Sequence, residues 1–279
     1  MIYHAISKLP FGMLYSLSNV MAFLLYHVFR YRRDISYKNL SRAFANKSKQ
    51  EIRQIQKSAY LHLTDSFLET LKANTISDDE ILNRVELVDF EEVQAQINSG
   101  KSLFLLTAHT APIDWVAFSL HLNLHCIIDP VYKPIHYKTL DRFIFATRSR
   151  HGGTPIPYKK VAKDVILRKH VNRSIAMLAD LEPRSRDQAL EVTFLNQPTR
   201  FFLGSERVVK LTDYPTYFIG IKQLSRGHYQ AYAEKLSDHP KDLAAQELTR
   251  KYVNCVEKIV LDNPSAWLWT HRRWKHTLI

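Results

Sequence analysis

The spacing of apolar residues changes along this 279-residue chain and separates a helical beginning from a region of mixed strands and helices. Capping-box sequences at residues 48–51 and 77–80 predict helices that begin near residues 49 and 78. Apolar side chains recur at helical spacing through the first of these helices, at Ile52, Ile55, Tyr60, Leu63, Phe67 and Leu71. The sequence therefore predicts one long amphipathic helix before the mixed region begins.

From residue 85 onward, short β-rich runs alternate with helical stretches. The runs that predict strands are residues 85–90, 103–108, 125–132 and 174–179. The stretches that predict helices lie near residues 112–122, 137–149 and 160–170, with a last helix at about 241–262. Two later runs, 216–223 and 228–234, flank a turn and predict an antiparallel hairpin. This alternation predicts an α/β fold with a mainly parallel, mixed sheet flanked by helices.

The N-terminal part of the chain contains an uncharged stretch of nineteen residues at 11–29, and three arginines follow it within residues 30–33. Its length is close to the ~20 residues that cross a bilayer, so we expect an N-terminal helical membrane anchor at residues 1–33. If the stretch spans the bilayer, the basic flank places the remaining domain, residues 34–279, on the cytoplasmic side. A tilted or interfacial helix that lies on the membrane fits its composition at least as well. An ordinary buried helix that packs on this domain is the alternative for the stretch.

Composition limits the classes of partner. The chain is 46% hydrophobic, enough for a large core, and carries a net charge of +12, which indicates an acidic partner. Nucleic acid, an anionic membrane and an acidic or phosphorylated carrier all fit this charge. Because the basic residues are spread along the chain without a nucleic-acid-binding motif, no nucleic acid partner is expected. Cys126 and Cys255 lie in apolar or helical patterns without C-x-x-C spacing, so neither a disulfide framework nor a zinc site is expected.

A histidine and an aspartate follow the apolar run at residues 102–108. His109 and Asp114 lie five positions apart, and Pro112 between them suits the first turn of a helix. His109 would then stand at the carboxyl end of a strand, where open α/β sheets place their chemistry. Histidine titrates near neutrality and can take a proton from an alcohol, while a carboxylate on its other ring nitrogen fixes the tautomer. The pair predicts a general base, His109, oriented by Asp114, and a strand-end histidine that only caps a loop is the structural alternative.

Two further residues are candidates for contact with a substrate. Asp180 follows the apolar run at residues 174–179, at the carboxyl end of a predicted strand, where a site residue and a helix-capping residue are both expected. Arg148 and Arg150, with three lysines within residues 159–163, predict either a patch that binds a phosphate or carrier or a solvated helix face. We take Arg148 as the substrate-binding candidate of this patch.

Several motifs occur in a fixed order along almost the whole chain. They are Arg32-Arg33 followed by Asn39-Leu40 and Ala43-Phe44, then Glu69, the H-x4-D spacing of His109 and Asp114, the arginine-rich turn at 148–152, and the glycine-containing helix start at 201–206. The closing segment at 267–275, Trp-Leu-Trp-Thr-His-Arg-Arg-Trp-Lys, is the most specific, and we expect it to pack on the core rather than to lie among lipid headgroups. With these motifs the chain resembles, nearly end to end, the bacterial lipid A biosynthesis acyltransferases, the family of lauroyl and myristoyl transferases.

The resemblance implies a glycerolipid-acyltransferase-like fold and O-acyltransferase activity. In this family a fatty acyl group moves from a thioester, on acyl carrier protein or CoA, to a hydroxyl of a membrane lipid such as a lipid A precursor or a related glycolipid. His109 and Asp114 match the catalytic H-x4-D/E motif of the family. The chemistry requires no cofactor and no metal. The implied location is the cytoplasmic face of the bacterial inner membrane, whose anionic surface suits a positively charged chain.

The chain departs from the family pattern at two positions. Asp114 stands where the family more often has glutamate, which shortens the reach toward His109 by one methylene. Asp180-Leu181-Glu182-Pro183 stands where the family commonly has Asp-Gln and a glycine-containing turn. These departures leave open a different hydroxylated lipid or a pigment as the acceptor. A non-catalytic membrane-associated scaffold is the other alternative.

Overall fold

The computed structural model describes residues 2–183 and 188–275. Within these residues, seven strands form one sheet in the order β1-β9-β8-β2-β5-β3-β4. Their bounds are Val85–Val88 (β1), Leu103–Thr107 (β2), Ile128–Tyr132 (β3), Ile156–Pro157 (β4), Ser174–Leu178 (β5), Thr216–Ser225 (β8) and His228–Ser237 (β9). Paired strands are parallel except β8 and β9, which form the expected antiparallel hairpin. The prediction of an α/β fold with a mainly parallel sheet is confirmed.

The central strand β2 divides its side chains between two hydrophobic cores. Phe104 and Leu106 belong to the core that α9, α10 and α11 cover, whereas Leu103 and Leu105 belong to the core that α5, α6 and α7 cover. These helices span Asp78–Arg84 (α5), Glu91–Asn98 (α6), Ile113–Leu124 (α7), Val161–Leu167 (α9), Gly204–Thr212 (α10) and Glu247–Asp262 (α11). Because both faces of β2 are covered, its sequence is a continuous apolar run and not an alternating one.

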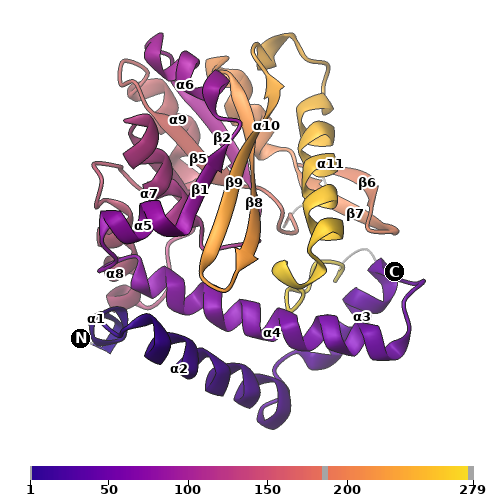
Figure 1. Ribbon diagram of the computed structural model, residues 1–279. Coiled ribbons are helices and arrows are strands. Elements are labelled where there is room, and N and C mark those ends of the chain that lie inside the picture. The colour runs from indigo at the N-terminus through magenta and orange to yellow at the C-terminus, as the bar shows by residue number, and fades with distance from the viewer. Residues whose placement is uncertain (1, 184–187, 276–279) are drawn as a thin grey trace.

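The helices that precede the sheet are α1 (Ile2–Ser7), α2 (Phe11–Phe23), the π-helical turn η1 (Leu24–Val28), α3 (Arg33–Ala43) and α4 (Lys49–Lys72). The capping box of α4 forms as predicted, because Ser48 Oγ accepts from the Glu51 N–H and the Glu51 carboxylate accepts from the Ser48 N–H. Ser77 caps α5 in the same way through the Glu80 N–H. In Figure 1, α4 runs along one end of the sheet, and α2 lies beside it on the side away from the strands.

Helix α2 and η1 together provide one stretch, Phe11–Val28, that is long and apolar enough to cross a membrane, with a mean hydropathy of 1.3. Only 22% of this stretch is buried. The buried side chains, among them Leu14 and Ser18, face α4, while Val20 and Phe23 are more than half exposed. The stretch is therefore a candidate membrane anchor that also packs on the domain through one face.

Several short strands and turns are not predicted from the sequence, and two predicted elements, β3 and α11, begin later in the structure than expected. Strands β6 (Ala189–Phe194) and β7 (Gln197–Phe202) form a separate two-stranded sheet, joined by Leu195 and Asn196, which both have positive φ. A leucine is an unusual residue for such a turn, so the sequence carries no clear hairpin signal there. Strand β3 starts three residues later than expected because His125 ends α7 in the left-handed conformation. Helix α11 starts at Glu247, after a short 3-10 turn at Pro240–Asp242.

Candidate active site

His109 lies two residues after the end of β2, as the sequence predicts. Its ring is partly exposed, with 34% of the side chain accessible, and its Nδ1 lies 2.7 Å from Oδ1 of Asp180. The His109 backbone N–H donates to the other carboxylate oxygen of Asp180 at 3.1 Å. Because an ionised carboxylate only accepts, Nδ1 carries the proton and Nε2 is left as the basic nitrogen.

The register of two neighbouring strands brings this pair together. Strands β2 and β5 are parallel, and Thr107 pairs with Leu178 at their carboxyl ends. His109 and Asp180 each lie two residues further along, so they meet just beyond the sheet. Tyr252 of α11 fixes the two ends, since its hydroxyl donates to the Thr107 carbonyl at 2.8 Å and accepts from the Ala179 N–H at 3.2 Å.

Asp180 is fully buried, and donors occupy both of its carboxylate oxygens. The third donor is the indole N–H of Trp267, 3.0 Å from Oδ2. Burial alone would raise the pKa of Asp180, but the His109 ring and the donors from His109 and Trp267 lower it to about 2. Asp180 is thus ionised at neutral pH and faces His109. From the sequence, Asp180 is expected to contact a substrate. The geometry suits a different role, in which the carboxylate positions His109.

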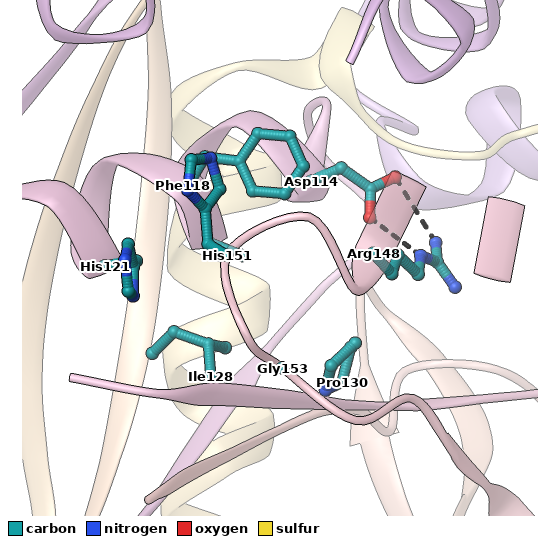
Figure 2. Close-up of a pocket in the computed structure, with 9 residues that line it drawn as sticks. Asp114, Phe118, His121, Ile128, Pro130, Arg148, His151 and Gly153 are labelled. Carbon is teal, nitrogen blue, oxygen red and sulfur yellow. Dashed lines mark hydrogen bonds and ion pairs between the residues drawn. The ribbon is translucent and has the colours of Figure 1, made fainter. Parts of the chain in front are cut away.

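The expectation that Asp114 orients His109 is wrong in its contacts. Asp114 lies in the first turn of α7, where its carboxylate turns toward helix α8 (Lys138–Arg148) and pairs with Arg148. Arg148 Nε lies 2.7 Å and Nη2 lies 3.4 Å from the two carboxylate oxygens. Figure 2 shows the guanidinium and the carboxylate facing each other. The role of Asp114 as a catalytic residue stays a prediction, but it would act through Arg148.

Asp114 and Arg148 line a small pocket between α7, α8 and β3 (Figure 2). The other lining residues are Ala117, Phe118, His121, Ile128, Pro130, His151 and Gly153. Its volume of about 20 Å³ holds roughly one water molecule, so this pocket does not accommodate a fatty acyl chain. Arg148 still has N–H groups beyond the two that Asp114 accepts, and its assignment as a substrate-binding residue stays a prediction.

Arg150, which the sequence groups with Arg148, has a structural role instead. Its guanidinium donates to the carbonyls of Ala73 and Ile76 just after α4. It also pairs with Asp78 at the start of α5, with 2.9 Å between Nη2 and Oδ1. Arg150 therefore joins two helices, and these contacts do not support a patch built on both arginines.

The closing segment packs on the core beside Asp180, as expected. Trp267, Trp269 and Trp274 are all buried, and each indole N–H has one acceptor. Trp267 donates to Asp180, Trp269 to the Pro264 carbonyl and Trp274 to Thr199 Oγ1. Trp267 is not predictable as a site residue from the sequence, because only the fold brings it next to Asp180.

A second cluster of buried carboxylates lies on α4, between α2 and the β8–β9 hairpin. Glu69 is fully buried and accepts from the hydroxyls of Tyr15 and Tyr229 at 2.8 and 2.7 Å. Burial raises its pKa to about 7, against the lowering effect of the two tyrosine donors. One turn earlier, Asp65 accepts from Ser18 of α2 and forms a two-point ion pair with Arg226 of the hairpin.

These features define an α/β protein with a histidine–carboxylate pair at the carboxyl ends of two central parallel strands, and no group of three or more potential metal ligands among its described residues. The family model described as "Bacterial lipid A biosynthesis acyltransferase" matches residues 1–276. The chain therefore belongs to this family of acyltransferases. A comparison with curated proteins finds no match.

Proposed function

We propose that this protein transfers a fatty acyl group from an acyl thioester, on acyl carrier protein or CoA, to a hydroxyl of a membrane lipid. We propose a lipid A precursor or a related glycolipid as the acceptor. Membership of the family supports the reaction class. The single observation that carries the proposal is the His109–Asp180 contact, which leaves the partly exposed His109 ring with one basic nitrogen.

In the proposed reaction, His109 Nε2 takes the proton of the acceptor hydroxyl as the oxygen attacks the thioester carbonyl carbon. The carbon–sulfur bond then breaks, and the leaving thiolate takes the proton from the imidazolium. An ester and a free thiol are the products, so the proton and the electron pairs balance. Asp180 stabilises the imidazolium between these two steps and holds the ring in one tautomer.

In this scheme the Asp114–Arg148 pair supplies a fixed cation for substrate contact, and Asp114 lies five residues beyond His109 along the chain. Two of the five N–H groups of Arg148 point at Asp114, and the side chain lines the adjoining pocket. Its remaining donors suit a phosphate of either substrate or the oxyanion of the tetrahedral intermediate. Asp114 would then contribute to catalysis by holding the guanidinium in place.

We further propose that the protein works at the cytoplasmic face of the bacterial inner membrane. The exposed apolar face of α2, including Val20 and Phe23, and the net charge of +12 support binding to an anionic bilayer. Phe23→Glu should weaken co-flotation with vesicles that contain anionic phospholipid, because it places a charge on that face. Leu261→Glu, at a half-exposed position on α11, is the matched control and should float like the wild-type protein. Equal flotation of all three proteins would contradict the proposed membrane-binding face.

The test of the reaction uses full-length protein in detergent, an acyl thioester and a purified lipid A precursor, with products identified by mass spectrometry. The wild-type protein should add the mass of one acyl group to the acceptor. His109→Ala should lower turnover by about 10²-fold to 10⁴-fold, the range that a general base contributes. Undiminished transfer by His109→Ala would overturn the proposed mechanism. Transfer only to another hydroxylated lipid or a pigment would overturn the proposed acceptor.

A further inference from the structure

The closing segment contributes a side chain to the candidate site that the proposed reaction does not use. Trp267 donates its indole N–H to Oδ2 of Asp180 at 3.0 Å. The same oxygen accepts from the His109 backbone N–H, while the other oxygen faces His109 Nδ1. Asp180 has no solvent exposure, so each of its donors is a protein group that replaces water.

Packing holds the Trp267 ring in a fixed position. Its side chain is buried, and its ring makes edge contacts with Phe194, Trp269 and Trp274 at centroid distances of 5.6, 4.9 and 6.0 Å. A ring enclosed in this way cannot turn its N–H toward another acceptor without moving its neighbours. The donor therefore fixes the plane of the Asp180 carboxylate as well as satisfying one oxygen.

We propose that Trp267 is a positioning residue, which fixes the orientation of Asp180 and, through it, the tautomer and direction of the His109 ring. This inference rests on the proposed function of His109 as the base. It makes a three-part chain in which the indole holds the carboxylate and the carboxylate holds the imidazole. Trp267 itself touches neither substrate in this scheme.

Other charged groups lie around the His109–Asp180 pair and also interact with it electrostatically. Arg273 lies over the Phe201 ring at 4.5 Å, is buried, and has no hydrogen-bond partner for its guanidinium among the described residues. Electrostatic interactions also link the Asp180 region with Glu182, Tyr252, His271 and Arg32. All of these groups stay in place in the variants below, so a difference between the variants reports on the indole donor.

The experiment compares Trp267→Phe with Trp274→Phe as a matched control. Both substitutions remove one indole from the same aromatic cluster, but Trp274 donates to Thr199 and not to Asp180. Trp267→Phe should lower kcat by about 10-fold to 100-fold, the loss expected for a hydrogen bond to a charged group, and leave KM within about twofold. It should also move the acidic limb of the pH–rate profile to higher pH, because the Asp180 anion loses a stabilising donor.

The control separates this role from a general effect on packing. Trp274→Phe should keep the wild-type pH profile, even where it lowers thermal stability as much as Trp267→Phe. Equal effects of the two substitutions on kcat and on the pH profile would overturn the inference. In contrast, full activity of His109→Ala would overturn the proposed role of His109 as the base, and no acyl transfer by the wild-type protein would overturn the proposed function. These failures are therefore distinguishable from a failure of the inference.

A measurement on the unmodified protein covers the case in which Trp267→Phe does not fold. The indole ¹H–¹⁵N resonances of the wild-type protein in detergent would be followed as the pH is lowered. The Trp267 resonance should shift with the same midpoint as the acidic limb of activity, because protonation of the His109–Asp180 pair alters its acceptor. The Trp269 and Trp274 resonances are internal controls, and a Trp267 resonance that shifts no more than these two would contradict the inference.

Discussion

Asp180 and Glu69 are both fully buried carboxylates that accept hydrogen bonds from aromatic side chains, yet their pKa values shift in opposite directions. The pKa of Asp180 is lowered to about 2, although burial acts to raise it, whereas burial raises the pKa of Glu69 to about 7. The difference lies in the partners. Asp180 faces His109, which can carry a positive charge, and accepts from a backbone N–H. Glu69 accepts from two phenols, and of the charges near it Asp65 raises its pKa more than Arg226 lowers it.

This comparison teaches that the count of donors alone does not set the pKa of a buried carboxylate. A neighbour that can become positively charged, as His109 does when it takes a proton, lowers that pKa together with the donors. Within the second cluster, Arg226 pairs at two points with Asp65, one turn before Glu69. The cluster at the strand ends therefore holds a permanent charge beside His109. The cluster on α4 holds the Asp65–Arg226 ion pair and one further carboxyl group, Glu69, whose pKa is about 7.

The largest expected difference between the two regions is in catalysis. Asp180→Asn should lower acyl transfer by about 10²-fold or more, because the amide favours the wrong tautomer of His109 and cannot stabilise the imidazolium. Glu69→Gln should keep activity within a few-fold, since Glu69 contacts α2 and the hairpin and not His109. Initial rates at saturating acceptor measure both effects. A loss for Glu69→Gln as large as that for Asp180→Asn would break the distinction.

The second expected difference is in the pH dependence of stability. The folded pKa of Glu69, about 7, exceeds its ordinary value of 4.5, so its stabilising contribution is complete below about pH 4.5 and is lost as the pH rises through 7. Denaturant unfolding should therefore show wild-type stability falling relative to Glu69→Gln between these limits, by up to about 3 kcal/mol. Asp180 has the opposite sign, because its contribution is present above about pH 4 and is lost as the pH falls toward 2. A difference between wild type and Glu69→Gln that does not change with pH would contradict this account.

A smaller effect is expected at the Asp114–Arg148 pair, where the charges are balanced but only partly enclosed. Asp114→Asn leaves the guanidinium without its partner, and because 23% of the Arg148 side chain is exposed, the cost should be about 2 kcal/mol. The control is Asp78→Asn, because Asp78 also pairs with an arginine but is half exposed, so it should cost under about 1 kcal/mol. Chemical denaturation measures both values, and equal costs would show that burial of Asp114 has no influence.

The local part of the site was predictable from the sequence, and the long-range part was not. A buried apolar run followed by a histidine is enough to place His109 at the end of β2, and the same reasoning places Asp180 after β5. That these two strands are neighbours in matching register is a property of the assembled sheet, which joins residues 71 positions apart. The sequence therefore assigned the orienting role to Asp114, the nearest carboxylate along the chain.

The same limit applies to the fold. Strands β2 and β5 and helices α4 and α7 have strong apolar patterns or caps, and the sequence identifies them. The β6–β7 hairpin depends on Leu195 and Asn196 in left-handed conformations, which local preferences do not indicate. Neither does the sequence reveal that Trp267 reaches Asp180, since 87 residues separate them.

Helix α2 has one exposed apolar face and one face buried against α4. This arrangement limits how a more water-soluble variant of the enzyme can be designed. Trimming the first helices away would strip Glu69 of its Tyr15 donor and Asp65 of its Ser18 donor, and would open the interior to solvent. Trp115, next to Asp114, donates to the Glu69 carbonyl, so the damage would reach the helix that starts beside His109. Substituting polar residues for the exposed apolar ones of α2, such as Val20 and Phe23, keeps the buried face intact. This change is the better way to prepare the protein without detergent.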